Sequence, residues 1–358
     1  MRVLHIGEYI KGGVATYIRE VVDFQISRKE ITDIYLMQSS SNSEVTYKLP
    51  DTHLITYNYK RKIPYFIKSL FKINKEIKKL NPDIIHVHST FAGVFVRLPL
   101  LFYKRDFKVI YCPHGWAFCM ETSEIKRKIY LAIEKLLAKR TDLIINISEY
   151  EQFESIKRGI SRDKLLLINN GISNQREIRN IQLDLDKNKI NILFVGRFDK
   201  QKGLDILLSF LKTYDNNALR FYIIGDNVLE NIDIEIPSSV ITLGWIDNSK
   251  IDSYYSLFDA VIIPSRWEGF GLVAIEAMKN KKAIIVSNRG ALPDFVKVNN
   301  GYVFELENLE TLEIILDSLN KEELVQKGNK GFELFNSCYT SIRMNEEILN
   351  CYEELLQE

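Results

Sequence analysis

The chain has 358 residues, which is too long for one ordinary core and fits two domains. Hydrophobic residues make up 46% and charged residues 27%, as in globular proteins, and no segment approaches the roughly 20 consecutive apolar residues that span a bilayer. The net charge of +1 conceals an asymmetry. Residues 1–170 contain 28 Lys and Arg against 18 Asp and Glu, a net +10, which leaves −9 for residues 171–358. This composition argues against a membrane-spanning or disordered chain and predicts that the first half meets an anionic surface or substrate.

Strand-like apolar runs alternate with helix-length segments along the first half, the pattern of a parallel sheet covered by helices. The first residues lack the cleavage site of a secretory leader, and we expect a cytoplasmic protein. The predicted strands are Val3–Gly7, Thr32–Met37, Asp83–His88, Lys108–Cys112, Leu143–Ile147 and Lys164–Ile168. The predicted helices are Val14–Gln25, Pro64–Leu80, Phe91–Leu101, Glu124–Arg140 and Glu149–Lys157.

A turn signal at Asn169-Asn170-Gly171 marks the expected domain boundary, and a second alternating series follows it. Its predicted strands are Asn191–Val195, Arg220–Ile224, Val240–Leu243, Ala260–Ile263, Ala283–Val286 and Tyr302–Phe304. The sequence therefore predicts an α/β protein of two facing, doubly wound Rossmann-like domains, with a ligand in the cleft at their switch points. The expected domains are residues 1–170 and 171–340, with a C-terminal helix over 341–358 that packs back on the first domain.

The loop after the opening strand contains Gly12 and Gly13 and leads into a helix. Glycines let backbone N–H groups approach an anion, and a helix N-terminus adds partial positive charge, so a phosphate contact is one interpretation. The loop lacks the glycine spacing of dinucleotide sites and P-loops, and a plain tight turn explains it equally well.

Two cations, Arg197 and Lys202, follow the first strand of the second half, next to Gly203 at the start of a helix. Together with the helix N-terminus they are placed to converge on a diphosphate, a leaving group that gains charge. The alternative is a solvated basic turn.

Two glutamates eight positions apart, Glu268 and Glu276, lie in the segment from Pro264 to Ala277. Glu268 belongs to a glycine-containing loop at a strand end, and Glu276 lies about two turns into the next helix, so both can face one crevice. Glu276 is surrounded by apolar residues, where an unpaired carboxylate is costly, and ribose hydroxyls are suitable partners. Pairing with a neighbouring Lys or Arg is the structural alternative.

His114 follows the strand Lys108–Cys112 and precedes Gly115, a position from which it can hydrogen-bond a bound sugar. A single histidine is also commonly structural. His86 and His88 alternate along a strand and point the same way, but a metal needs at least one further ligand and the sequence suggests none. We interpret them as core or crevice-lining residues.

These motifs together resemble the retaining glycosyltransferases of family 4, which have the GT-B architecture of two facing Rossmann-like domains, and resemble in particular those that build bacterial O-antigen and capsular polysaccharides. The resemblance covers nearly the whole chain, in order, from Gly12-Gly13 through the Asp83–His88 strand to the two glutamates. One departure is Ser287-Asn288-Arg289-Gly290-Ala291, where relatives usually have a Gly-Gly pair.

The resemblance implies a role for each matching position. Arg197 and Lys202 would bind the donor diphosphate, Glu276 the ribose, and Glu268 the transferred sugar. His114 would lie near that sugar and Gly13, with Gly12, near its phosphate. Backbone N–H groups of the loop would contact the sugar or diphosphate; these belong to Phe270, Gly271 and Leu272. No metal or other cofactor is implied.

The predicted reaction is transfer of a hexose or N-acetylhexosamine, with retention, from a nucleotide sugar to a lipid-diphosphate-linked saccharide of a bacterial surface polysaccharide. UDP is favoured over GDP on family grounds. The rival hypotheses are a nucleotide-sugar 2-epimerase on the same architecture and a non-catalytic nucleotide-sugar-binding protein. An epimerase would release free nucleotide without any acceptor.

A basic segment, residues 60–79, contains eight Lys and Arg and one Glu among aromatic and aliphatic residues. It is typical either of a helix that lies on anionic lipid or of an ordinary amphipathic helix with a solvated cationic face. The first interpretation predicts a cytoplasmic enzyme held peripherally at the inner face of the cell membrane. No nucleic-acid-binding module is recognised, and we expect no nucleic-acid partner.

Overall fold

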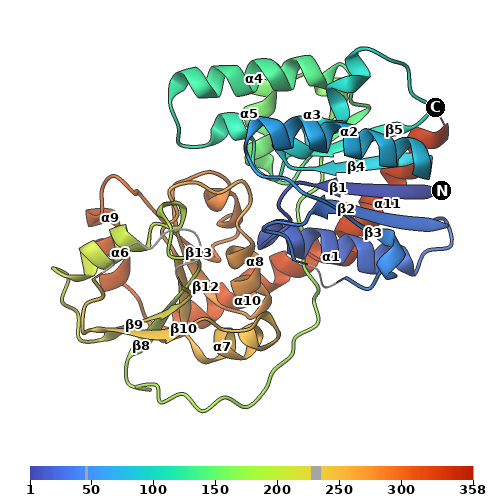
Figure 1. Ribbon diagram of the computed structural model, residues 1–358. Helices are drawn as coiled ribbons and strands as arrows, with labels where there is room; N and C mark the ends of the chain where they lie inside the picture. The colour runs from blue at the N-terminus through green and yellow to red at the C-terminus, as the bar shows by residue number, and fades with distance from the viewer. Residues whose placement is uncertain (45–46, 227–234, 358) are drawn as a thin grey trace. The chain divides into compact units, whose positions relative to one another are not determined.

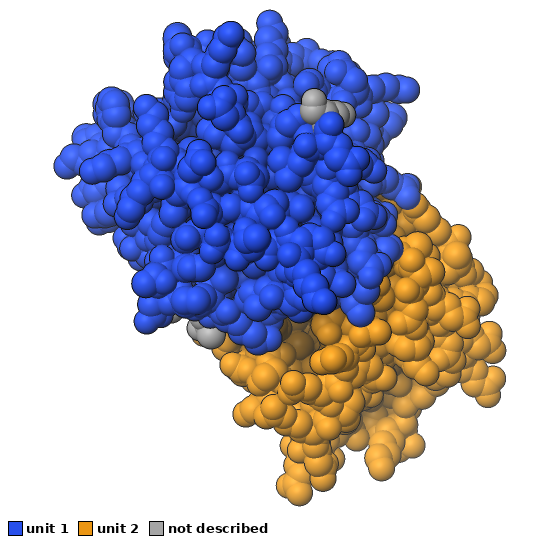
Figure 2. All heavy atoms as spheres, turned by 90° about the vertical axis from the view of Figure 1, so that its right-hand side faces the viewer, with its two compact units in different colours: residues 1–172, 341–358 blue, residues 173–340 orange. Residues whose placement is uncertain are grey.

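The computed structural model describes residues 1–44, 47–226 and 235–357. They form two compact units, one made of residues 1–172 with 341–358 and the other of residues 173–340 (Figure 2). Each unit is a parallel sheet covered by helices (Figure 1), so the predicted α/β class with two Rossmann-like, parallel-sheet domains is confirmed. Within the described residues no helix is long and apolar enough to cross a bilayer.

Unit 1 has a seven-stranded sheet in the order β3-β2-β1-β4-β5-β6-β7, in which every pair of neighbours is parallel. The central strands are apolar and buried on both faces, as parallel strands covered by helices must be. Strands β1 to β3 are added successively toward one edge of the sheet, and β4 to β7 toward the other edge. The switch point therefore lies between β1 and β4. The strands are β1 Arg2–Gly7, β2 Asp33–Ser39, β3 Leu54–Tyr57, β4 Ile84–His88, β5 Lys108–Cys112, β6 Leu143–Asn146 and β7 Leu165–Leu167.

The helices of unit 1 cover both faces of this sheet (Figure 1). One core cluster joins the sheet to α2, α3 and the end of α4, and another joins it to α1 and the C-terminal helix α11. The segment that closes the chain therefore packs beside the first helix of unit 1. The helices are α1 Gly13–Ile26, α2 Ile63–Leu80, α3 Thr90–Arg97, α4 Glu124–Ala138, α5 Glu149–Lys157 and α11 Ser341–Gln357.

Unit 2 repeats the architecture with a six-stranded parallel sheet in the order β10-β9-β8-β11-β12-β13. Its switch point lies between β8 and β11, so the loops after these two strands emerge side by side. The strands are β8 Ile190–Val195, β9 Leu219–Ile224, β10 Val240–Gly244, β11 Ala260–Ile263, β12 Ala283–Ser287 and β13 Gly301–Phe304. The helices are α6 Leu204–Leu211, α7 Ile251–Leu257, α8 Leu272–Lys279, α9 Glu310–Asp317 and α10 Lys321–Cys338.

All twelve predicted strands are present, with ends that differ by one or two residues. Two elements differ from prediction. β3 was not predicted, because this four-residue edge strand, which pairs with β2, is too short to show a period. The helix expected to reach Leu101 ends at Arg97, and a separate 3-10 turn at Pro99–Leu101 follows because proline has no N–H to continue the helix.

Candidate functional site

The loops at the switch point of unit 2 pack closely against one another. At two glycines in these loops there is no room for a side chain. A Cβ on Gly203, whose φ is 68°, would lie 2.0 Å from the carbonyl oxygen of Pro264. A Cβ on Gly290, whose φ is 57°, would lie 2.1 Å from the carbonyl oxygen of Glu268. Glycine at these positions therefore holds the loops after β8, β11 and β12 against one another. Gly290 is part of the segment that departs from the Gly-Gly pair of relatives, and it keeps the glycine that the packing needs.

Arg197 and Lys202 are held in the loop between β8 and α6 by Asp199. The Arg197 guanidinium lies 2.9 Å from Asp199 Oδ2 and also donates to Gln201 Oε1. Asp199 Oδ1 in turn accepts the backbone N–H of Lys202 at 3.1 Å, which fixes the turn. Both cations thus have defined positions at the carboxyl end of β8, beside the N-terminus of α6.

Glu268 is the partner of Lys202 across the switch point. The Lys202 ammonium donates to Glu268 Oε1 at 2.6 Å, and the hydroxyl of Ser265 donates to the same oxygen at 2.9 Å. The Glu268 side chain is 8% exposed and that of Lys202 18%, so the pair is shielded but open on one side. The structure therefore brings together the cationic loop and the first glutamate of the second motif, which are 66 residues apart.

Glu276 lies on α8, where the hydroxyl of Tyr255 donates to its Oε2 at 2.8 Å. Burial raises the pKa of the Glu276 carboxyl, while the Tyr255 hydrogen bond and the charges of Lys279 and Lys202 act in the opposite direction. Within the part of the chain that the structure describes, Tyr255 is the one hydrogen-bond donor to this carboxylate. Among residues 1–44, 47–226 and 235–357, no ion pair involves Glu276.

The residues between the two glutamates form the N-terminus of α8. Gly271 is the cap residue and Leu272 the first residue of the helix, so backbone N–H groups there have no partner within the helix. Phe270 is buried and packs edge-on against Phe295 and Tyr339, which anchors the loop. The helix start therefore presents donors near the glutamates, as a bound anion or sugar oxygen requires.

In unit 1, Gly12 and Gly13 lie where the β1 loop enters α1. Gly12 is the cap residue, and its N–H donates to Glu44 Oε1 at 3.2 Å. A Cβ on Gly12 would meet nothing within 4 Å, so this loop is open on that side.

His114 follows β5 with φ 52°, a left-handed conformation that is uncommon for residues other than glycine. It is partly exposed, whereas His86 and His88 on β4 are fully buried and therefore core residues. No third residue was predicted for the two strand histidines. The structure supplies one, because His5 of β1 lies in register with His86 and its ring nitrogen comes within 4.8 Å of theirs.

Several supporting residues were not found from the sequence. Asp199, Gln201, Tyr255 and Ser265 orient the four charged side chains of unit 2, and His5 joins the histidines of unit 1. Asp199 and Gln201 lie inside the motif itself, so their presence beside two cations was a usable signal. Tyr255 had no such signal.

Two Rossmann-like units are the architecture of the GT-B glycosyltransferases, and the comparisons with known proteins identify the chain as a glycosyltransferase. The chain belongs to the family 4 glycosyltransferases. The model of Glycosyltransferase Family 4 matches residues 11–176, and that of Glycosyl transferases group 1 matches residues 175–330.

Individual proteins agree with this assignment. An uncharacterized 41.2 kDa protein from the cps region of Klebsiella pneumoniae is 38% identical over 328 residues, which cover 89% of this chain and 90% of that protein. The Escherichia coli UDP-Gal:alpha-D-GlcNAc-diphosphoundecaprenol alpha-1,3-galactosyltransferase is 27% identical over 266 residues, 68% of each chain. The crystal structure of Anabaena HepE with UDP-glucose superposes with a TM-score of 0.77 at 16% identity, over 99% of this chain and 100% of that one.

Proposed function

We propose that this glycosyltransferase transfers a hexose or N-acetylhexosamine, with retention and without a metal ion, from a UDP-sugar to a lipid-diphosphate-linked saccharide during synthesis of a bacterial surface polysaccharide. The observation that supports it most is the Arg197, Lys202 and Glu268 arrangement beside Glu276. The named substrates of the Escherichia coli relative, the cps-region origin of the Klebsiella relative and the HepE complex with UDP-glucose support the finer assignment.

The reaction breaks the bond between the anomeric carbon and the diphosphate oxygen, and the electron pair stays on the diphosphate. Arg197 and Lys202 would stabilise this growing charge, which is the role that a metal ion serves in other transferases. The acceptor hydroxyl oxygen attacks from the face that the diphosphate leaves, and its proton passes to a leaving phosphate oxygen. No covalent intermediate on the protein is needed in this mechanism.

The remaining residues would position the donor. Glu276 accepts hydrogen bonds from the ribose hydroxyls through the oxygen that Tyr255 leaves open. Glu268 accepts from a sugar hydroxyl, and its contact with Lys202 couples sugar binding to the diphosphate. The N–H groups at Phe270, Gly271 and Leu272 donate to the sugar or diphosphate. For unit 1, the proposed roles are sugar recognition for His114 and phosphate recognition for the Gly12-Gly13 loop.

Donor and acceptor screening tests this proposal. Purified protein is incubated with UDP- and GDP-sugars, with and without undecaprenyl-diphosphate-linked saccharides, and products are identified by mass spectrometry with the anomeric configuration read by NMR. We expect product only with acceptor present, and at unchanged rate in excess EDTA. Release of free UDP and an epimerised sugar without acceptor would instead identify an epimerase.

Variants of the cationic loop test the roles of its residues. R197A and K202A are each expected to lower kcat by about 10²–10³-fold, because each removes one preorganised partner of the leaving group. K200A is the matched control, since Lys200 lies in the same loop but is exposed to solvent. Normal turnover in both R197A and K202A would refute the diphosphate assignment.

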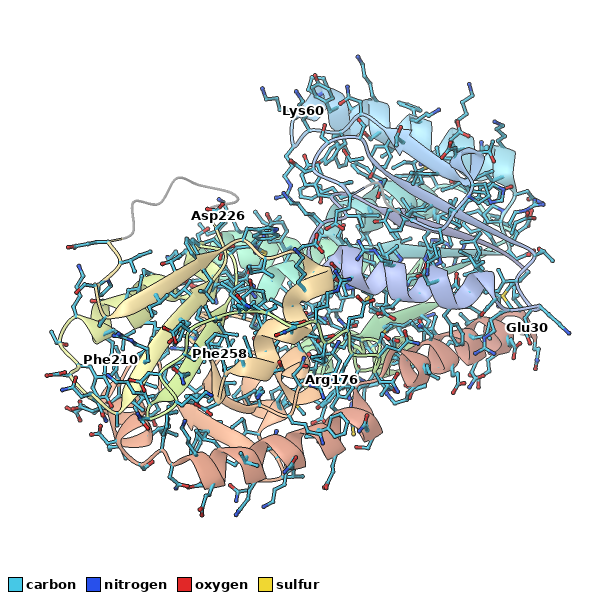
Figure 3. All side chains as sticks on the ribbon, turned by 90° about the horizontal axis from the view of Figure 1, so that it is seen from below. Glu30, Lys60, Arg176, Phe210, Asp226 and Phe258 are labelled. Atoms are coloured by element: carbon cyan, nitrogen blue, oxygen red, sulfur yellow. The ribbon has the colours of Figure 1, made fainter. Side chains whose placement is uncertain are left out.

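The basic segment, residues 60–79, is the proposed membrane contact. Its helix α2 exposes Ile63, Ile67 and Phe71 by 77%, 50% and 69%, one turn apart along one stripe. The lysines of the segment are exposed to solvent, and Lys60 marks the start of the segment in Figure 3. Large exposed apolar side chains among lysines match the requirements of an anionic bilayer surface.

A second stripe on α4 supports the same partner. Ile125, Ile129, Ile133 and Leu136 are 73%, 52%, 37% and 46% exposed, at the i, i+4, i+8 and i+11 spacing of one helix face. α2 and the end of α4 pack against the same core cluster of unit 1. Pairing α4 with a copy of itself would place like charges together, because its solvent-facing charges are mainly basic.

Vesicle co-sedimentation tests the membrane contact. We expect binding to vesicles that contain phosphatidylglycerol and little binding to pure phosphatidylcholine. I67E and I129E should each weaken binding, whereas I314E, at an exposed isoleucine of unit 2, is the matched control. Binding that is independent of anionic lipid, or unchanged in I67E and I129E, would contradict this contact.

A further inference from the structure

All five histidines of the chain lie in unit 1; four of them form one cluster, and three of these four are completely buried. Their rings lie against one another, with centroids 4.3 Å apart for His86 and His88 and 5.2 Å for His88 and His114. The proposed mechanism uses only His114. The others join it in one continuous chain of hydrogen bonds, called here the histidine relay, which consists of His114, His88, His5, Gln25, Tyr352 and His86.

The outer half of the relay has a defined direction. Gln25 Oε1 can only accept, so the bond of 2.8 Å requires the hydrogen on His5 Nε2. A neutral imidazole has one N–H, so His5 Nδ1 must accept from His88 Nε2 at 3.0 Å. His88 Nδ1 then accepts from His114 Nε2, also at 3.0 Å. The orientation of one amide therefore places the proton of three rings.

The inner half runs from Gln25 to the C-terminal helix. Gln25 Nε2 donates to the hydroxyl of Tyr352, which lies 2.6 Å from His86 Nδ1 and donates to it. His86 must then have its hydrogen on Nε2, a buried atom that has no hydrogen-bond partner among the described residues. α11 thus closes the relay, although it is more than 200 residues from every histidine in the chain.

Burial keeps these rings neutral, and each neutral ring therefore has a single N–H. It lowers the pKa of His5 to about 4 and that of His114 to about 3, and it holds those of His86 and His88 well below the usual range. A metal held by His5, His86 and His88 is the competing use of the cluster. It would displace the His88–His5 hydrogen bond, because both nitrogens of that bond face the same space.

We propose that Gln25, His5 and His88 are positioning residues that fix the ring and proton of His114, so that its Nδ1 is an acceptor for a substrate hydroxyl. At that atom the one contact found among the described residues is the Cys112 thiol, at 3.7 Å, a weak donor that a sugar hydroxyl can replace. The backbone of His114 supports this role, since it holds a left-handed conformation that aims the ring at His88. The inference rests on the proposed function for the contact of His114 with substrate.

Nitrogen-15 NMR of histidine-labelled protein tests the relay directly, because five histidines give a resolvable spectrum in which protonated and bare ring nitrogens differ. We expect His114, His88 and His5 all to be protonated at Nε2 and bare at Nδ1. A mixture of tautomers at His114, a proton on its Nδ1, or stoichiometric zinc in the purified protein would overturn the proposal. This measurement needs neither activity nor a folded variant.

Two variants of Gln25 separate positioning from packing. Q25M keeps the length of the side chain but removes both polar atoms, so the tautomers of His5, His88 and His114 should become mixed and kcat/KM should fall about tenfold. A carboxyl oxygen of Q25E still accepts from His5, so the three tautomers and most of the activity should return. Equal spectra and equal activity in Q25M and Q25E would overturn the relay.

Titration with UDP-glucose and with UDP links the relay to substrate. We expect the nitrogen-15 chemical shift of His114 Nδ1 to change when UDP-glucose binds but not when UDP binds. The chemical shifts of His53 should stay unchanged. If UDP-glucose binds by calorimetry and His114 does not move, the positioning role is overturned while the donor assignment stands. If no UDP-sugar binds, the proposed function fails, and the tautomers of the free protein still decide whether the relay exists.

Discussion

The buried histidines predict that unit 1 is destabilised in mild acid. Their pKa values in the folded protein lie below the ordinary 6.5, so the unfolded chain binds more protons, and stability falls as the pH drops below about 6.5. From pH 7.5 to 5.5 each histidine costs about 1.4 kcal/mol, and four cost about 5 kcal/mol. Glu151 acts oppositely, because burial raises its pKa to about 8 and stability is lost as the pH rises from about 4.5 to 8. Its contribution offsets about 2.5 kcal/mol over the same range.

The assay is urea unfolding followed by the fluorescence of Trp116, a buried residue of unit 1, in a W245F/W267F background. The free energy of unfolding should fall by about 3 kcal/mol between pH 7.5 and 5.5, and by about 5 kcal/mol in E151Q, which removes the opposing group. H53Q, which removes a histidine outside the relay, is the control. A loss in E151Q below about 1 kcal/mol would refute the reasoning, since four histidines that stay neutral in the folded protein cannot give so small a loss.

Three further substitutions test packing and the candidate site. Y255F removes the hydrogen bond to Glu276 and should raise the donor KM about fivefold with kcat nearly unchanged; an equal loss of kcat would contradict a ground-state ribose contact. G290A places a Cβ 2.1 Å from a carbonyl oxygen at φ 57°, so the thermal midpoint of unit 2 should fall by several degrees, and an unchanged midpoint would argue against that loop packing. R97M removes the ion-pair partner of the buried Glu134, 2.9 Å away, and should lower the free energy of unfolding in urea by about 3–5 kcal/mol. R97M/E134L should recover part of this loss. A double variant no more stable than R97M would contradict the ion-pair explanation.

The sequence predicted most of the fold because its strands are strongly apolar and end at glycine, proline or asparagine. Strand order, in contrast, depends on contacts between distant segments. The pairing of β8 with β11 determines that the two motifs of unit 2 meet, and no local pattern encodes this pairing. The general rule that ligands bind at the carboxyl ends of parallel strands, together with the resemblance to family 4 glycosyltransferases, allowed the motifs to be grouped. The short edge strand β3 was missed because its residues are neither fully buried nor clearly alternating.

The site was predictable at the level of residue types and not at the level of partners. Two cations that follow a strand and a glutamate in an apolar helix can be recognised in the sequence. The hydrogen-bond partner of that glutamate cannot be recognised there, because Tyr255 is one of many aromatic residues and only the fold brings it within 2.8 Å. His5 shows the same limit, since it is a single polar residue in an apolar strand. Parallel register with β4 gives it His86 and His88 as neighbours, and a helix from the far end of the sequence supplies the hydroxyl that completes their hydrogen bonds. A buried strand histidine is therefore a reason to ask which strand lies beside it, because the answer decides whether it is a core residue or one link in a site.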